Sequence, residues 1–509
     1  MREELSHENE IKAIKLLGSD FEKSLVIRKQ KNDKTKIQMI DAIQSEEIKS
    51  DIIANFVNDD KYKIEGLNKL KDYYYITNVI ISLNSDENRI NKIEEIDLLN
   101  KVEEYTKTRI IRSFNSDEIK MKMIDLLKFD SLKCDVIESF NNDENKIKML
   151  NTLKENKHKM KIIMSFKEDK NKIKVLNCLT EIEKTEVAIG FKDDASKLEI
   201  LNGLSKKYKI VTAISLKDEK KKIEILKDFI DSNCINIDLG LPSKMTLGIE
   251  IEAEYISEEE DLGYLLYNQM LMGWMFKCDL SLDNGVETVS PIMHNNKNDL
   301  KKIPIITNLL SEMGFITNKT CGGHVHIGAD YLESTDDFME LLDLWESAEK
   351  IFYIISNKPG ELPRDGIGKY AAPISNKVEK DKIKKDEFIE KIKKIQEKKN
   401  SDINFMNVNT EKNTIEFRLS NGTIDYNTWI ENIKLYGRVI QMAYEISKIK
   451  RKLIQGQKLT EEELKKIRYK IMLKKSISLD KKKDALMGIL FNEEERQPYE
   501  ERYKINKEL

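Results

Sequence analysis

The sequence predicts a multidomain protein: an N-terminal all-α solenoid of two-helix repeats, followed by an α+β domain with an antiparallel sheet. Its 509 residues exceed the usual length of one domain. A motif recurs about every 25 residues through the first half of the chain. In the second half, three segments alternate apolar and ionisable residues with the period of a strand that has one buried face. These segments are 248–254, 322–327 and 414–419.

Composition narrows the class of protein. The chain is 40% hydrophobic and 35% charged, with a formal net charge of -3, which gives no general case for binding nucleic acid or membranes. Five scattered cysteines without a CxxC motif are typical of reduced thiols. The first residues, MREELSHENEIKAIK, contain no apolar signal core. No apolar segment approaches the roughly 20 residues that span a bilayer. We therefore expect a soluble, cytoplasmic protein.

Residues 10–235 form the predicted repeat array. Its anchor residues are mostly 25 to 27 positions apart, with one gap of 31; they are Gln30, Phe56, Leu83, Phe114, Phe140, Phe166, Phe191 and Leu216. An aspartate follows most anchors by three positions, and we predict that it is the N-cap of a helix. These aspartates are Asp33, Asp59, Asp86, Asp117, Asp143, Asp169 and Asp194. Apolar residues such as Ile147 and Leu150 then form a helical stripe. Each repeat of about 25 residues is therefore predicted to consist of two short helices, and neighbouring repeats are predicted to stack on one another.

The role of the array stays open. It could recruit a protein partner or substrate, or it could only support the C-terminal domain. Its positions rich in Lys and Glu are predicted to be solvated outer faces.

The helical pattern ends near residues 233–242, where Gly240 and Pro242 interrupt it. Residues 245–450 are predicted to form the α+β domain, with helices at 299–313 and 335–357. A charge-dense insertion at about 376–400 is predicted to be a solvated helix or a mobile segment. Residues 451–509 are predicted to be a helical C-terminal extension.

The first strand-like segment places Glu250, Glu252 and Glu254 on one face. Carboxylates in a row raise one another's pKa unless a cation lies among them. Mg²⁺ prefers carboxylate oxygens and commonly bridges them to phosphates, so these glutamates are candidate metal ligands. An exposed edge strand with a negative stripe is the alternative.

The second segment carries two of the five histidines in the chain. His324 and His326 share one strand face, and this spacing suits metal ligation or phosphate contact. A pair of core histidines is the alternative. The neighbouring Cys321 is predicted to be a small buried thiol and not a nucleophile.

Two further segments add charged groups. A turn around Asp283-Asn284-Gly285 precedes a short strand with Glu287. Glu416 and Arg418 share a strand face, where Glu416 could bind a metal and the planar fork of Arg418 could bind a phosphate; a plain salt bridge stays open. No complete phosphate-binding loop is found, so a nucleotide would be held by metals and side chains on the sheet.

These motifs, in this order, resemble the amidoligase family, relatives of glutamate–cysteine ligase in the glutamine synthetase superfamily. The motifs are G-I-E-I-E at 248–252, D-L-S-L with G-V-E-T-V-S-P at 279–291, G-G-H-V-H at 322–326, R…Y at 364–370 and T-I-E-F-R at 414–418. The resemblance covers about residues 245–440. It implies a curved antiparallel sheet around a funnel, with ATP and Mg²⁺ or Mn²⁺ at its centre. It also implies an ATP-dependent ligase that joins a carboxylate to an amine through an acyl phosphate.

The resemblance also implies a role for each matching residue. Glu250, Glu252, Glu287, His326 and Glu416 would be metal ligands, and His324 a further ligand or a phosphate contact. Glu250, Glu287 and Arg418 would be catalytic, with Arg418 on the transferred phosphate, while Arg364 and Tyr370 would contact substrate. Leu280 stands where the family usually has Gly, which leaves the role of Asp279 open.

Two other function classes stay open. A zinc-dependent hydrolase could use His324 and His326 as ligands. A catalytically inactive domain on a binding scaffold is the other alternative. The sequence does not name the carboxylate or the amine, which could be a small amino acid, a peptide or a protein terminus.

Overall fold

The computed structural model describes residues 9–229, 237–257, 262–279, 281–282, 284–378, 383–396 and 400–509. The chain forms two compact units, Met1–Lys192 and Asp193–Leu509. Residues 233–236 of the predicted boundary lie outside the described residues, as do Cys234, Leu280 and Asp283. The division into 10–235, 245–450 and 451–509 stays a prediction.

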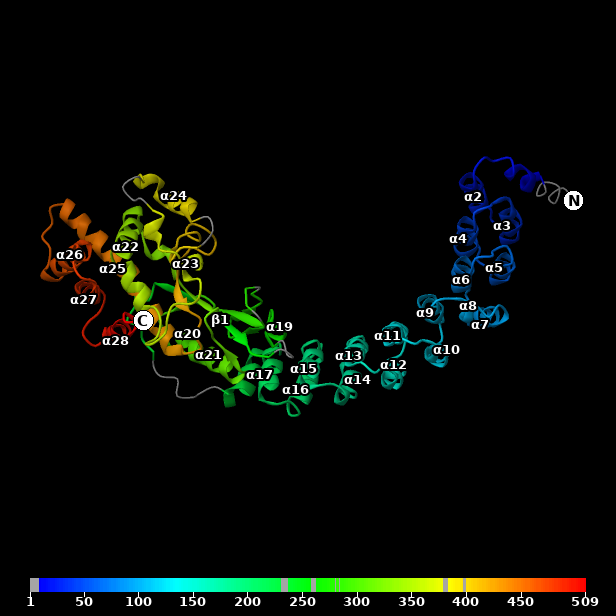
Figure 1. Ribbon diagram of the computed structural model, residues 1–509, viewed down its shortest axis with the longest axis horizontal. Coiled ribbons are helices and arrows are strands. Elements are labelled where there is room, and N and C mark those ends of the chain that lie inside the picture. The colour runs from blue at the N-terminus through cyan, green and yellow to red at the C-terminus, as the bar shows by residue number, and fades with distance from the viewer. Residues whose placement is uncertain are drawn as a thin grey trace. The chain divides into compact units, whose positions relative to one another are not determined.

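The first unit consists of short helices that follow one another in pairs (Figure 1). An additional helix, α8, lies in the gap of 31 residues between two anchors. The predicted helical N-terminal region is therefore confirmed. The pairs are α2 (Asp20–Arg28) with α3 (Asp33–Met39), α4 (Glu46–Phe56) with α5 (Asp60–Leu67), α6 (Tyr73–Ile81) with α7 (Asp86–Glu95), α9 (Glu104–Arg112) with α10 (Asp117–Met123), α11 (Asp130–Glu138) with α12 (Asp143–Met149), and α13 (Asn156–Met164) with α14 (Asp169–Ile173); α8 (Leu98–Lys101) and α15 (Glu181–Ile189) complete the unit. Single 3-10 turns follow several second helices: η1 (Ile40–Ala42), η2 (Ile124–Leu126), η3 (Leu150–Thr152) and η4 (Leu176–Cys178).

The aspartates of the repeat motif have a different role from the predicted one. Only Asp59 is an N-cap, and the other six are the first residue of their helix. Asp143 instead accepts hydrogen bonds from the backbone N–H groups of Lys167, at 2.9 Å, and Glu168, at 3.4 Å. The N-cap prediction holds for Asp59 and was wrong for the other six; in four of these helices an Asn or Ser one position earlier is the cap, because Asn and Ser cap as well as Asp does. An Asn or Ser at the cap leaves the next carboxylate free to bond the following helix pair.

A second correction concerns lysines of the second helices. Lys63, Lys120 and Lys146 are buried, although the Lys-rich positions were predicted to be solvated. The ammonium of Lys63 donates to the backbone carbonyl of Ser82 at 2.6 Å, and that of Lys120 donates to Ser139 at 2.9 Å. The aliphatic stem of a lysine can be buried when its charged end finds an acceptor. The prediction of solvated faces was therefore wrong at this position of the motif.

The second unit begins with three more short helices and continues into an antiparallel sheet. The described residues contain nine strands, in the order β2-β3-β4-β1-β7-β9-β8, while β5 and β6 also pair with β1. An α+β domain with an antiparallel sheet is therefore confirmed. The strands are β1 (Thr246–Tyr255), β2 (Met270–Leu271), β3 (Trp274–Lys277), β4 (Gly285–Val289), β5 (Met293–His294), β6 (Phe315–Ile316), β7 (Gly322–Gly328), β8 (Ile403–Asn404) and β9 (Thr414–Asn421). The helices are α16 (Asp194–Leu201), α17 (Lys206–Ile214), α18 (Glu219–Leu226), α19 (Leu262–Leu266), α20 (Lys297–Leu300), α21 (Lys302–Glu312), α22 (Thr335–Ile355), α23 (Ile367–Tyr370), α24 (Phe388–Ile395), α25 (Tyr426–Ile454), α26 (Glu461–Lys474), α27 (Leu479–Leu490) and α28 (Gln497–Asn506).

Aromatic residues join the apolar face of the sheet to the two longest helices, α22 and α25. Phe417 of β9 stacks on Tyr436 of α25, with ring centroids 4.5 Å apart and planes 3° apart. Trp345 of α22 lies 5.2 Å from the Phe417 ring. Because successive side chains of a strand point to opposite faces, burial of Phe417 directs Glu416 and Arg418 to the other face.

The charge-dense stretch 376–400 is only partly described, because residues 379–382 and 397–399 lie outside the described ranges. Its described part includes α24, which buries Phe388 and Ile392. This helix is therefore amphipathic and not fully solvated.

No described helix meets the requirements of a transmembrane span. The helix α25 has 29 residues. Within the described ranges, every helix falls short of either the length or the apolarity that a transmembrane span requires.

Replacing Asp143 by Ala should destabilise the protein by about 1–3 kcal/mol, because the N–H groups of Lys167 and Glu168 lose their shared acceptor. Urea denaturation followed by far-UV circular dichroism measures this change. Glu144→Ala, at the next and exposed position, is the control and should change stability by less than about 0.5 kcal/mol. Equal effects of the two variants would contradict the bonding role of Asp143.

Candidate active site

The polar sides of four strands form one continuous face of the sheet. Glu250 on β1 lies opposite His324 on β7, and Glu416 on β9 lies opposite His326. On the other side of β1, Glu252 lies opposite Glu287 of β4. Residues directly opposite in an antiparallel pair point to the same side. Charged groups that are distant in the sequence therefore share one surface.

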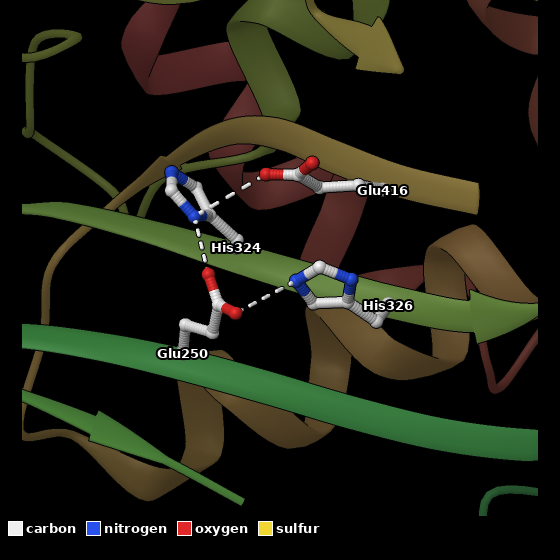
Figure 2. A group of neighbouring side chains, drawn as sticks. All are labelled: Glu250, His324, His326 and Glu416. Carbon is white, nitrogen blue, oxygen red and sulfur yellow. Dashed lines mark hydrogen bonds and ion pairs between the residues drawn. The ribbon is translucent and has the colours of Figure 1, made fainter. Parts of the chain in front are cut away.

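Four of these side chains form a carboxylate–imidazole cluster: Glu250, His324, His326 and Glu416 (Figure 2). One ligand atom of each lies within 4.8 Å of those of the other three. Nδ1 of His324 is 2.9 Å from Oε2 of Glu250 and 3.5 Å from Oε1 of Glu416. Nε2 of His326 is 3.4 Å from Oε1 of Glu250.

The cluster favours ionised carboxylates. Burial alone would raise the pKa of Glu250, but the hydrogen bonds from His324 and His326 hold that pKa well below its usual value. Burial also raises the pKa of Glu416. His324 and Arg418 oppose this effect and hold the pKa of Glu416 below its usual value. Two ionised carboxylates this close to each other, one buried and one partly buried, require positive charge beside them.

The side chains of the cluster fit a divalent cation. Two carboxylates and two imidazoles suit Mn²⁺ or Zn²⁺, and the carboxylates also suit Mg²⁺. Nε2 of His324 is buried and has no hydrogen-bond partner among the described residues. Figure 2 shows this nitrogen on the side of the ring away from both carboxylates, so Nδ1 is the nitrogen of His324 that faces them.

Two neighbouring side chains orient members of the cluster. Nδ2 of Asn404, on β8, donates to Oε2 of Glu416 at 3.0 Å. Oγ1 of Thr414 lies 3.3 Å from Nδ1 of His326. Such outer contacts fix the ring and carboxylate orientations that metal binding needs.

Two arginines lie beside the cluster. Arg418 pairs with Glu416, and its Nε donates to the carbonyl of Tyr370 at 3.2 Å. The Arg364 guanidinium lies 5.0 Å from the Tyr370 ring centre, and its Nη1 is 3.4 Å from Oε2 of Glu252. Nε of Arg364 is buried without a hydrogen-bond partner among the described residues.

Arg364 occupies its place because Gly322 of β7 has no side chain. A Cβ at Gly322 would overlap Nη1 of Arg364. The backbone N–H of Arg364 donates to Oδ1 of Asn421 at 2.8 Å, which fixes the loop that carries the arginine. The arginine is therefore positioned from both its side chain and its backbone.

Two of the predicted metal ligands lie outside the cluster. Glu252 accepts a hydrogen bond from the backbone N–H of Gly322 and pairs with Arg364. Glu287 lies 3.9 Å from Nζ of Lys277. Burial, and then the charge of Glu250, raise the pKa of Glu287 to about 7.

Two further sequence candidates have ordinary local contacts. Asp279 accepts hydrogen bonds from the backbone and hydroxyl of Ser281, at 2.8 and 2.7 Å. Cys321 is fully buried, as the sequence predicted, and burial raises the pKa of its thiol to about 11. A thiol that stays protonated is a poor nucleophile.

A cavity of about 350 Å³ lies directly beside the cluster. Glu250 and His326 line it, and Gly248, Val289 and Lys412 are among its other lining residues. Its apolar and polar walls could hold the organic part of a small substrate against the cluster.

Sequence reasoning missed three residues that orient the site: Asn404, Thr414 and Asn421. Thr414 could have been found, because it lies two positions before Glu416 on the same strand face. Asn404 lies on a strand of two residues, too short to give a periodic signal.

Gly322→Ala should displace Arg364 and leave Glu252 buried without its partner, at a cost of about 3 kcal/mol. Gly368→Ala is the control, because a Cβ there would meet nothing within 4 Å. Urea denaturation of both variants checks this expectation. A stable Gly322→Ala protein would show that Arg364 does not need the space above Gly322.

The raised pKa of Glu287 predicts a pH-dependent effect of Glu287→Gln. Ionisation of this partly buried carboxylate destabilises the fold as the pH rises through about 7, whereas glutamine stays neutral. The variant should therefore gain stability over the wild type between about pH 5 and about pH 8, by up to about 3 kcal/mol. Thermal unfolding in the presence of EDTA measures the difference at each pH. A difference that does not change with pH would contradict the shifted pKa.

One of three comparisons with known proteins finds a match. A family model described as "putative amidoligase enzyme" matches residues 153–440. Comparisons with curated proteins and with solved structures find no match. The matched residues make up more than half of the 509-residue chain and include all members of the carboxylate–imidazole cluster. The match also begins well before the sheet, in the short helices. The chain therefore belongs to the amidoligase family.

Proposed function

We propose that this protein is an ATP-dependent carboxylate–amine ligase that forms an amide or isopeptide bond through an acyl phosphate. The proposal rests on one observation: two carboxylates, two imidazoles and two guanidinium groups lie on one face of a sheet, beside a cavity. Membership of the amidoligase family supports a ligase. The donor set provides both cation ligands and anion ligands, as a nucleotide triphosphate requires.

Each group has a proposed role. Glu250, His324, His326 and Glu416 would hold Mg²⁺ or Mn²⁺, and that cation would neutralise charge on the ATP phosphates. Arg418 and Arg364 would bind phosphate oxygens, because a planar guanidinium donates two parallel hydrogen bonds to them. The pairing of Arg418 with Glu416 holds the guanidinium beside the cation ligands.

The proposed reaction has two steps. An oxygen of the substrate carboxylate attacks the γ-phosphorus, the bond to the bridging oxygen breaks, and ADP leaves. The amine nitrogen then attacks the acyl carbon and loses a proton, and inorganic phosphate leaves. Arg418 would orient the transferred phosphoryl group in both steps. The cavity beside Gly248 would hold the organic part of a substrate and limit access of water.

The helix pairs and the sheet also have proposed assignments. We propose that the helix pairs form a solenoid that acts as a scaffold or as a surface for a partner or protein substrate. We also propose that the sheet domain has the curved architecture of glutamine synthetase and glutamate–cysteine ligase.

The direct test is an assay for ADP and phosphate with ATP, Mg²⁺ or Mn²⁺, and pools of amino acids as carboxylates and amines. Release should require the metal, the carboxylate and the amine together. Glu250→Gln and Arg418→Ala should each lower kcat/KM by at least about 100-fold, because each removes a charge that faces the phosphates.

Glu254→Gln is the matched control, because Glu254 lies on the same strand face but bonds to Asn318 and Thr320. It should keep most of the activity. Release of AMP and pyrophosphate would contradict an acyl phosphate and indicate an acyl adenylate.

The two imidazoles of the cluster favour one other candidate, a zinc-dependent hydrolase. This candidate gives no role to Arg364 and Arg418. Metal analysis of the purified protein separates the two functions. Tight, stoichiometric zinc without ATP binding would support hydrolysis, whereas weak Mg²⁺ or Mn²⁺ binding that ATP strengthens would support ligation.

A further inference from the structure

Successive helix pairs are joined by a recurring pair of contacts. In α10, Asp117 accepts hydrogen bonds from the backbone N–H groups of Asn141 and Asn142, at 3.0 and 3.1 Å. Three residues on, Lys120 donates to the backbone carbonyl of Ser139 at 2.9 Å. An acid and a lysine on one helix thus hold an amide and a carbonyl two residues apart in the next helix pair.

The same arrangement recurs along the described chain. In each case the lysine donates to a backbone carbonyl and the acid accepts from the backbone N–H two residues later. The acid and lysine, followed by the residues of that carbonyl and that N–H, are Asp33 and Lys36 with Phe56 and Asn58, Asp60 and Lys63 with Ser82 and Asn84, Asp117 and Lys120 with Ser139 and Asn141, Asp143 and Lys146 with Ser165 and Lys167, and Asp194 and Lys197 with Ser215 and Lys217. The residue between the bonded carbonyl and amide is apolar and buried in each case: Val57, Leu83, Phe140, Phe166 and Leu216.

After the last helix pair, α17 with α18, the next described residues lead into the sheet and form no further helix pair, yet the contacts continue. Glu219, the first residue of α18, accepts a hydrogen bond from the backbone N–H of Met272. Lys222 donates to the backbone carbonyl of Met270. The carbonyl and amide are again two residues apart, and Leu271 between them is fully buried. These groups belong to the hairpin of β2 and β3.

The hairpin presents these groups because of its tight turn. Leu271 pairs with Trp274, so only Met272 and Gly273 form the connection, with φ of 51° and 84°. Positive φ at both central residues is the geometry of the hairpin turn that follows strand twist. Met270 and Met272 are thus held with one carbonyl and one N–H directed to α18.

Further contacts support the same junction. Nζ of Lys207, on α17, donates to the hydroxyl of Tyr255 at the end of β1, at 2.7 Å. Nδ2 of Asn308, on α21, donates to the carbonyl of Phe229 at 2.7 Å. The family match, which begins at residue 153, also includes α17 and α18 with the sheet.

We propose that the β2–β3 hairpin is the closing unit of the repeat array, with Leu271 as its anchor residue and the sheet domain as its cap. A repeat array exposes apolar surface at its ends unless a different element covers it. Here the hairpin bonds the last helix pair with the same acid–lysine contacts that join five other successive pairs of the described chain. Because β3 pairs with β4, which carries Glu287, this junction also fixes the edge of the sheet beside the candidate site.

Hydrogen exchange measured on the full-length chain tests the proposal. In Glu219→Ala/Lys222→Met, the amides of residues 271–277 should exchange at least about tenfold faster, because the hairpin loses two charge-assisted hydrogen bonds. Asp117→Ala/Lys120→Met is the matched control. It should accelerate the amides of 141 and 142 and leave 271–277 unchanged.

Wild-type exchange at 271–277 in the first variant would overturn the proposal. If Glu219→Ala/Lys222→Met loses its far-UV circular dichroism signal, the single variant Glu219→Gln decides the question, because the amide oxygen of the glutamine still accepts a hydrogen bond from the N–H of Met272. That variant should keep the fold and exchange at the Met272 amide faster than the wild type but slower than Glu219→Ala. An unchanged rate at Met272 in both single variants would also overturn the proposal.

Discussion

The packing of Phe417, a residue of β9, against the helices that cover the sheet determines which side chains face the candidate site. Its ring is fully buried against Trp345 and Tyr436, and burial of an aromatic side chain of this size is worth several kcal/mol. Because the strand alternates, this one buried ring sends the carboxylate of Glu416 and the guanidinium of Arg418 to the opposite face. The apolar residues of β1 and β7 act in the same way for Glu250, His324 and His326. The reactive face is thus a consequence of core packing.

Charge balance is the second constraint on this face. Glu416 is buried and Glu250 is partly buried, and removing an unpaired carboxylate from water is costly. The histidines and Arg418 offset that cost in the absence of a ligand. A divalent cation held by the same carboxylate oxygens would supply positive charge at this place without a change in the packing of the strands. Glu252 is balanced separately by Arg364, which explains why it takes no part in the cluster.

The sequence revealed each strand face but not the pairing between strands. The alternation in 248–254 was enough to predict that Glu250, Glu252 and Glu254 share a side. It could not distinguish Glu250, which meets two histidines, from Glu252, which meets an arginine, because that difference depends on register with β7. The position of Arg364 depended on the missing side chain of Gly322, and no local pattern encodes such a fit.

The aspartates of the helix pairs were misjudged for a related reason. A side chain that can cap its own helix can equally bond an amide some 25 residues away, and only the tertiary structure selects between them.

The turn at Met272 and Gly273 has a consequence for how this protein can vary. If the hairpin serves as the terminal module of the helical series, whole helix pairs upstream of α17 can be gained or lost without disturbing the chemistry. The final pair cannot be lost, because the carbonyl of Met270 would then lose the hydrogen bond from Lys222 and the N–H of Met272 the one to Glu219. Natural and engineered variants of different length should therefore share the segment from α17 onward, while the number of preceding pairs is free to change.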